Sequence, residues 1–379
     1  MTAPRRLAAG FAALTLVFFG LHGCNNLAAN LAPEKSDQEL KGTSTPAERD
    51  PAGEAQAQRI VFNRSAGSMA FICSVNSDGT GFSDLTDRTE VHKDLDPTRS
   101  PSGEHIAFTR RSRDRASHAG IYIMSPDGSN VRSLTSSEGF DGPPKWLPDS
   151  ERIVFFRQGP GEWKHYVVDI TNGSVSPVPD WMAGAWSPDG TRVAFVVPTT
   201  DHPDEHDMDL WVCDADGSNQ QRLTRFETAI LRPSWSPDGE TVLFVAEIGS
   251  GSQVLTVHAA TGKIETLLEE SETYYESPAW SPTGKRIAVV RSPRGADYST
   301  PDYFRQIWVM DVATGNFSRV TNARRSHYRP LWMADGKELV YQGNFGNNSS
   351  LYIANIEGSE EFRLTDAGGF DNNHDILPL

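Results

Sequence analysis

Two short patterns recur along this chain at an interval that few folds accommodate. The first is a turn of the form Trp-Ser-Pro-Asp-Gly followed by a β-branched run, and its clearest copies begin at Trp186 and Trp235. The second is a glycine turn between two apolar stretches, and neighbouring copies lie 43 to 53 residues apart. The glycines of this second series are Gly79, Gly128, Gly173, Gly217, Gly262, Gly315 and Gly358. Pro and Asp start tight turns and Gly accepts positive φ, so the repeats predict short strands joined by hairpins.

Four short strands at this period are typical of a propeller blade. The glycine turn occurs seven times but the Trp-type turn only six, because the first unit, from Ile60, lacks an innermost strand. Residues 364–378 match residues 134–148 without gaps, so we expect residues 370–379 to supply that strand. In the alternative, Asp50 and Pro51 supply it and the tail is frayed. The prediction is an all-β, seven-bladed β-propeller over residues 58–379, closed by the C-terminal strand, which also removes exposed strand edges.

The first residues carry a pattern typical of export. Arg5 and Arg6 precede an apolar stretch over 7–21 that is short for a membrane span. Residues 21–24, Leu-His-Gly-Cys, resemble the lipobox of bacterial lipoproteins, which implies that Cys24 carries the lipid. We predict a signal peptide over 1–23 and a lipidated cysteine with a disordered tether over 24–57. An uncleaved signal anchor and a plain secretory signal are the alternatives.

Charge and cysteine content exclude several classes of protein. The formal net charge is −15, and such an acidic surface repels phosphate backbones, so we expect no nucleic-acid partner. Three cysteines cannot form a disulfide scaffold. Cys73 and Cys213 fall on third strands of blades far apart in the ring, so we expect buried free thiols.

The repeated motifs resemble the TolB-like, WD-type (PD40) propeller repeats. The resemblance rests on the Trp-Ser-Pro-Asp-Gly turn, the Ile-Ala-Phe strand at 106–108, the Asp-x-Asp-Gly turn at 214–217 and Leu223-Thr224. It covers essentially the whole chain after the tether, and it implies the propeller fold and a protein partner, as for periplasmic TolB. TolB has a separate N-terminal domain, whose place the tether takes here. Related propellers precede serine peptidase domains, but this chain has no Gly-x-Ser-x-Gly motif.

The segments that lead into the innermost strands converge around the channel at one face of a propeller. Here they mix aromatic, acidic, basic and amide groups, as a recognition surface does. Tyr275, Tyr328, Arg232 and Arg329 are the preferred hot spots, because Tyr and Arg dominate binding energetics. The alternative is ordinary solvated loop residues and hydrogen bonds between blades. The predicted ligand-binding face comprises His92, Asp94, Asp141, Arg232, Tyr275, Glu276, His327, Tyr328, Arg329, Asn373 and His374.

Three patterns raise the question of a metal. His92, His327 and His374 come from neighbouring blades, and some propeller lyases that act on uronic-acid sugars hold a metal with histidines on this face. Here the three lie at different offsets from their strands, which argues against one preformed site. The loop over 201–209 has two histidines and five acids, but such a loop is normally solvated. Asp127, Asp216 and Asp238 are interpreted as Asx-type turn residues. We predict no cofactor.

Together these features predict a monomeric lipoprotein of the cell envelope. Its function is predicted to be non-catalytic binding, with the channel face capturing a protein, peptide or envelope glycan, and with membrane contact through the lipid alone. Asn25 is not the aspartate that retains lipoproteins at the inner membrane, so a two-membraned host favours the outer membrane, facing the periplasm. The alternatives are a metal-dependent lyase or hydrolase acting on a polysaccharide and a purely structural spacer.

Overall fold

The computed structural model describes residues 57–376, apart from 115–117, 136–138, 160–161, 200–206, 227, 294–303, 323–324, 346–347, 359 and 367–368. The predicted signal peptide, Cys24, nearly all of the tether and most of the acidic loop therefore lie outside the described residues. In the described part of the chain, no helix is long and apolar enough to cross a membrane.

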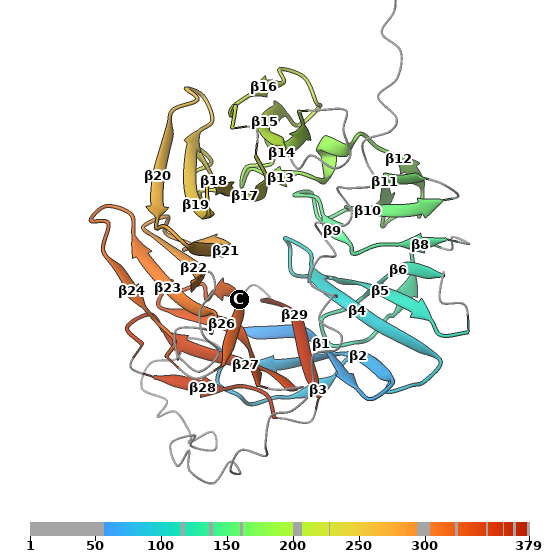
Figure 1. Cartoon of the computed structure of the whole chain (residues 1–379). Coiled ribbons are helices and arrows are strands. Elements are labelled where there is room, and N and C mark those ends of the chain that lie inside the picture. The colour runs from blue at the N-terminus through green and yellow to red at the C-terminus, as the bar shows by residue number, and fades with distance from the viewer. Residues whose placement is uncertain are drawn as a thin grey trace, which may run out of the picture.

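Short antiparallel strands are arranged around a central opening (Figure 1). In the described residues, the pairings group the strands into seven blades of four. The first three blades, from the innermost strand outward, are β29 (Phe370–Ile376), β1 (Arg59–Ala66), β2 (Met69–Asn76) and β3 (Ser83–Asp84); β4 (His92–Arg99), β5 (Ile106–Ser112), β6 (Ala119–Met124) and β7 (Arg132–Ser133); and β8 (Phe140–Asp141) with β9 (Lys145–Trp146), β10 (Arg152–Gly159), β11 (Glu162–Asp169) and β12 (Val175–Pro177).

The remaining four blades follow the same order. They are β13 (Ala185–Trp186), β14 (Arg192–Pro198), β15 (Met208–Asp214) and β16 (Gln221–Arg222); β17 (Ile230–Trp235), β18 (Thr241–Ile248), β19 (Gly251–His258) and β20 (Ile264–Glu269); β21 (Thr273–Trp280), β22 (Arg286–Pro293), β23 (Gln306–Asp311) and β24 (Phe317–Arg319); and β25 (Ser326–Trp332), β26 (Glu338–Phe345), β27 (Asn348–Asn355) and β28 (Glu361–Arg363). A short 3₁₀ helix, η2 (Asp180–Ala183), leads into β13.

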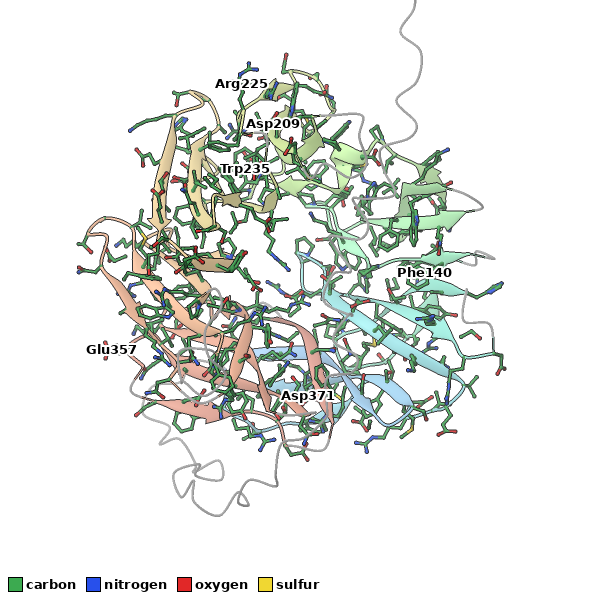
Figure 2. All side chains as sticks on the ribbon, in the orientation of Figure 1. Phe140, Asp209, Arg225, Trp235, Glu357 and Asp371 are labelled. Carbon is green, nitrogen blue, oxygen red and sulfur yellow. The ribbon has the colours of Figure 1, made fainter. Side chains whose placement is uncertain are left out.

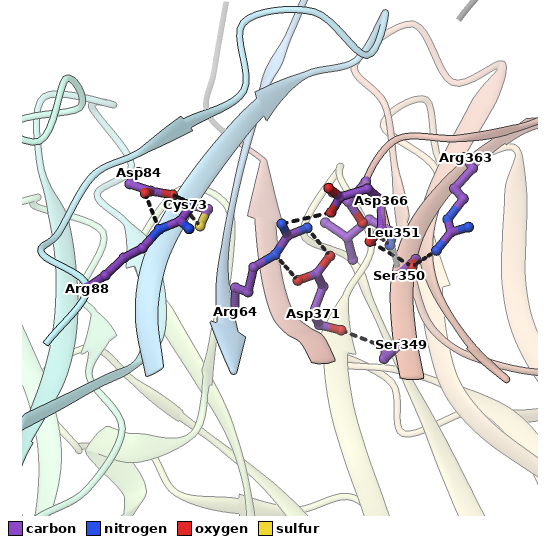
Figure 3. A network of polar contacts seen from close by, with 11 residues as sticks. Arg64, Cys73, Asp84, Arg88, Ser349, Ser350, Leu351, Arg363, Asp366 and Asp371 are labelled. Atoms are coloured by element: carbon purple, nitrogen blue, oxygen red, sulfur yellow. Dashed lines mark hydrogen bonds and ion pairs between the residues drawn. The ribbon is translucent and has the colours of Figure 1, made fainter. Parts of the chain in front are cut away.

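The C-terminal strand closes the ring, as the sequence predicts. β29 pairs antiparallel with β1, from Ile60 opposite Ile376 to Ser65 opposite Phe370. A buried ion pair reinforces the closure, since Arg64 donates to both carboxylate oxygens of Asp371 at 2.6 and 2.8 Å (Figure 3). Ser349 of β27 also donates to the carbonyl of Asp371 at 2.7 Å, which ties the last blade to the first.

Three tryptophans of the repeated turn pack against the preceding blade, whereas Trp186 donates to the carbonyl of Met182 in its own blade. The indole Nε1 of Trp146 donates to the carbonyl of Thr98, and those of Trp235 and Trp332 donate to Ala185 and Ala279. Each acceptor lies on the innermost strand of the preceding blade. The buried apolar clusters likewise join neighbouring blades, as where Leu210 and Val212 pack with Val242 and Phe244. Each blade therefore buries its faces against its neighbours.

The Leu-Thr ending of the repeat has a defined structural role. In five blades the threonine hydroxyl accepts a backbone N–H from the third strand at 2.8–3.0 Å. The five threonines are Thr86, Thr135, Thr224, Thr321 and Thr365. This bond satisfies a buried donor where the short fourth strand ends.

The smaller predictions on turns and thiols are also confirmed. Asp127, Asp216 and Asp238 each accept a backbone N–H two residues later, which is Asx-type turn bonding. Cys73 and Cys213 are buried free thiols. Burial raises the pKa of both, for Cys213 to about 11, so neither is a reactive thiolate at neutral pH.

Candidate ligand-binding channel

The innermost strands share an irregularity that shapes the wall of the channel. In five blades the ladder between the first two strands breaks, and at the break a non-glycine residue has φ between 48° and 54°. These left-handed residues are Asp96, Arg232, Ser277, Arg329 and Asn373. In all but the last, proline follows directly, which is tolerated because the innermost strand is the edge of its blade. A bulge on an edge strand changes the direction of a side chain, here toward the channel. We call these five residues the channel tier.

Contacts between blades place three members of the channel tier together. The guanidinium of Arg329 donates to the amide oxygen of Asn373, and the amide nitrogen of Asn373 donates to Asp96 at 2.6 Å. These three residues belong to the innermost strands of three consecutive blades. This chain of hydrogen bonds therefore crosses two junctions between neighbouring innermost strands. Figure 2 shows side chains from the innermost strands reaching into the central opening.

Further charged groups lie beside the channel tier. Asp375 accepts from the backbone N–H of Arg99 at 3.0 Å and from Thr98. The ammonium of Lys145 donates to the carbonyls of Ala183 and Gly184, at 3.0 and 2.6 Å. Although the residue as a whole is exposed, desolvation of its ammonium lowers the pKa of Lys145 to about 8.

The residues just before the channel tier form its rim. The guanidinium Nε of Arg305 donates to Glu276 at 3.1 Å, and the same guanidinium lies 5.3 Å from the ring centroid of Tyr328. Glu276 and Tyr328 are half-buried, so both remain accessible from the channel face. Arg305 was not among the predicted face residues. It directly precedes β23, the third strand of its blade, and so lies outside the segments that lead into the innermost strands.

The structure buries five of the eleven predicted face residues. Asp94 and Asp141 are fully buried, and each accepts two hydrogen bonds from one arginine of the next strand, Arg110 and Arg157 respectively. Together with Asp371 and Arg64, these pairs occupy the same position in the first three blades. Each aspartate lies directly opposite its arginine in the ladder, so the two side chains meet on one face of the blade. We therefore remove Asp94 and Asp141 from the candidate face.

The other three buried residues are Tyr275, His327 and His374. Tyr275 donates to Glu270 at 2.8 Å, and Glu270 in turn pairs with Arg291. Burial lowers the pKa of His327 to about 4 and that of His374 to about 3, so both are neutral at physiological pH. None of the three presents its polar atoms to a ligand. The accessible members of the predicted face are His92, Arg232, Glu276, Tyr328, Arg329 and Asn373.

The histidines have separate surroundings. His92 lies 3.7 Å from Asp94, whereas His327 lies against the carbonyl of Arg305 and the ring of Tyr341. Across the described residues, no three His, Cys, Asp or Glu side chains gather where they could hold a metal ion. The described part of the channel therefore offers hydrogen-bonding and charged groups rather than a preformed set of metal ligands.

A cavity of about 480 Å³ lies apart from the channel, in the fourth blade. Val197, Pro198 and Trp211 line it beside the carboxylate of Asp209. Arg222 forms an ion pair with Asp209, so the buried charge is already neutralised within the blade. The channel tier remains the stronger candidate for a binding site.

Part of the channel tier could have been found in the sequence. In four repeats a residue followed by proline stands three positions before the tryptophan or its equivalent: Asp96, Arg232, Ser277 and Arg329. That spacing is regular, and it marks the residues that the bulge turns into the channel. Lys145 and Asp375 stand two positions further along the strand, where only the packing of neighbouring blades decides what they contact.

Comparison with known proteins agrees with this architecture. Residues 182–378 match the family model described as TolB beta propeller domain. The Tol-Pal system protein TolB of Anaeromyxobacter dehalogenans (strain 2CP-1) is 30% identical over 192 residues, which are 49% of this chain and 42% of that protein. The first curated relatives are matched over 29% to 46% of their own length, so the chain spans less than half of each.

Two solved structures illustrate the breadth of the similarity. TolB from Acinetobacter baumannii superposes with a TM-score of 0.52 at 18% identity, over 85% of this chain and 67% of that one. An oligogalacturonate lyase in complex with manganese superposes with a TM-score of 0.56 at 16% identity, over 81% of this chain and 85% of that one. At such identities the similarity shows the propeller fold alone.

Proposed function

Because this chain belongs to the TolB β-propeller domain family, we propose that it is a binding module of the cell envelope whose channel face captures a protein or peptide partner. The observation that carries the proposal is the channel tier, in which charged and amide side chains are held at strained left-handed positions around a rigid ring. Strain of this kind is retained where the surrounding structure enforces it, and it concentrates at functional sites. A relative named for the Tol-Pal system supports a protein partner.

The proposed setting follows from the N-terminal residues. Removal of residues 1–23 leaves Cys24 as the lipidated N-terminus, and residues 25–57 act as a flexible tether of roughly 30 Å. The lipid anchors the protein to the outer membrane of a two-membraned host, facing the periplasm, and the propeller works as a monomer. An envelope glycan is the second class of ligand that this face suits, since sugars are also bound by mixed aromatic and charged groups. The described residues offer no set of metal ligands that favours a lyase.

Affinity capture with a matched pair of variants tests the proposal. Residues 25–379 are immobilised and exposed to envelope extract, beside a Tyr328→Ala, Glu276→Ala variant that alters the rim of the channel. The control is Lys263→Ala, Glu265→Ala, an exposed ion pair next to the turn between β19 and β20. In an antiparallel four-stranded blade, that turn lies on the face opposite to the entry into the innermost strand.

The proposal expects a partner that the parent protein and the control both retain and that the rim variant loses. A partner retained equally by all three would move the site away from the channel face. If no partner is retained by any of them, the binding role itself is contradicted.

A further inference from the structure

Two arginines of the channel tier differ from the other arginines of the ring. Arg232 and Arg329 occupy the same position in two blades, three residues before Trp235 and Trp332, and Ser277 occupies it in the blade between them. Both arginines are exposed. A guanidinium carries five N–H donors. Arg329 uses one nitrogen on Asn373, and Arg232 makes no hydrogen bond or ion pair with any described residue.

The arginines that hold strands and blades together have fixed partners. Arg64, Arg110 and Arg157 each pair with a fully buried aspartate of the innermost strand, and Arg291 pairs with Glu270. Arg132 and Arg192 instead donate to backbone carbonyls of the next blade. Arg232 has neither kind of partner among the described residues, and Arg329 donates to the amide of Asn373.

The two channel arginines also act on each other. Arg232 and Arg329 stand at the same bulge position on β17 and β25, the innermost strands on either side of a single blade. Desolvation and, after it, the positive charge of Arg232 lower the pKa of Arg329, while Asp96 and Asp375 act to raise it. These two acids also hydrogen-bond to neighbours, since Asp96 accepts from Asn373 at 2.6 Å and Asp375 accepts from the backbone of Arg99. The arc of Arg232, Ser277 and Arg329 itself contains two guanidiniums and no carboxylate, in a protein of net charge −15.

At the bulges, some backbone groups of the innermost strands have no partner in the ladder. The ladders skip Arg232 with Pro233, Ser277 with Pro278, and Arg329 with Pro330, so none of these residues has a partner on the second strand. Their carbonyls are thus not committed to a ladder, although that of Arg329 is contacted by the ring of His374. Carbonyls outside a ladder can accept the N–H groups of an extended peptide, as in recognition by strand addition.

We infer that the arc formed by Arg232, Ser277 and Arg329 is an anion site, which binds a carboxylate of the peptide ligand between the two guanidiniums. This inference rests on the proposed binding function and specifies its ligand. Arg–carboxylate pairs are bidentate and charge-assisted, and they strengthen where protein encloses them. Ser277 supplies a hydroxyl donor to the same carboxylate. The carboxylate belongs either to an acidic side chain or to the C-terminus of the peptide.

Short peptides of defined charge test the inference. Residues 25–379 are titrated by NMR or calorimetry with acetyl-Gly-Glu-Gly-amide, which has only a side-chain carboxylate, and with acetyl-Gly-Gly-Gly, which has only a terminal one. Acetyl-Gly-Gln-Gly-amide is the neutral control, and glucuronate represents a sugar acid. The variants are Arg232→Gln and Arg329→Gln, with Arg225→Gln as the matched control, since Arg225 is an exposed arginine at the outer edge of the ring (Figure 2).

We expect millimolar binding of at least one acidic peptide, weakened about tenfold or more by either channel variant and unchanged by Arg225→Gln. Whichever of the two peptides binds identifies the source of the carboxylate. Binding should also weaken as salt is raised, because the interaction is between charges. Thermal unfolding of each variant establishes that it is folded.

Three results would overturn the inference. They are absence of binding by both acidic peptides, equal binding by the neutral peptide, and binding that survives both channel substitutions. Binding of glucuronate in place of the peptides would overturn the peptide assignment. Each of these can occur while capture still depends on Tyr328 and Glu276, in which case the binding function stands and only the carboxylate site fails.

Discussion

At the scale of single residues, the first three blades share one ion pair, in which an arginine of the second strand binds a buried aspartate of the innermost strand. Burial alone would make such a carboxylate costly, and in Asp371 it raises the pKa even though Arg64 is in contact. The pair is tolerated because two hydrogen bonds satisfy both carboxylate oxygens. Its role is to fix the register and spacing of the two strands that flank the channel.

Breaking one of these ion pairs should therefore lower the stability of the protein strongly. Asp141→Leu leaves the guanidinium of Arg157 without its partner inside the third blade, and we expect the free energy of unfolding to fall by about 3–5 kcal/mol. The double change Asp141→Leu, Arg157→Leu removes both charges and should recover much of that loss. Denaturant titration measures both variants. Glu265→Gln, which breaks an exposed pair with Lys263, is the control and should cost about 0.5 kcal/mol or less.

A loss for Asp141→Leu no larger than for Glu265→Gln would contradict this account. So would a double variant as unstable as the single one, because that result would assign the cost to packing rather than to the unpaired charge.

At the scale of elements, Trp146, Trp235 and Trp332 on the innermost strands each join two blades by apolar contact and by one hydrogen bond. A comparison of Trp235 with Trp280 separates the contribution of the hydrogen bond from that of the apolar contact. The indole of Trp235 donates to the carbonyl of Ala185 at 2.8 Å, whereas the buried Nε1 of Trp280 has no partner among the described residues. The two residues otherwise occupy the same place in neighbouring blades.

We expect Trp235→Phe to lower the free energy of unfolding by about 1 kcal/mol more than Trp280→Phe, because only the first change removes a hydrogen bond and leaves a carbonyl unsatisfied. Both changes remove a similar amount of apolar ring, so each serves as the control for the other. Denaturant midpoints of the two variants measured side by side give the difference. Equal losses would mean that the hydrogen bond contributes nothing measurable to the contact between blades.

The elements were largely predictable from the sequence, because turn chemistry and strand periodicity are local. Pro, Asp and Gly mark the hairpins, and the match between the C-terminal residues and the third blade predicts the strand that closes the ring. The site was predictable only in part. Asp94 and Arg232 both belong to segments that enter the channel face, but Asp94 stands two residues before the bulge position and is buried, whereas Arg232 stands at that position and is exposed. Residues two apart lie on the same side of a regular strand, so the difference comes from the bulge, which the following proline signals only indirectly.

At the scale of the whole molecule, ring closure determines how stability is distributed. The contacts of each blade are almost wholly with its two neighbours, so stability approximates a sum of blades and interfaces. The first blade is assembled from both ends of the described chain, since β29 covers β1 while β27 contacts β29 in parallel at Ser349 and Phe370. The network around Arg64, Asp366 and Asp371 crosses this junction (Figure 3).

Deleting residues 370–379 should therefore open the ring, because it removes the innermost strand of the first blade. The deletion removes the ladder between β1 and β29, leaves Arg64 without the carboxylate of Asp371 and exposes Ile60 and Phe62, which are fully buried in the closed ring. We expect the Tm to fall by roughly 10 °C or more, since several kcal/mol are lost at one interface. A synthetic peptide of residues 369–379 added in trans should restore part of the loss in proportion to its concentration, because it binds only the folded ring. An unchanged melting curve would contradict closure by the tail, and a fall that the peptide leaves untouched would assign the damage to a cause other than the missing strand.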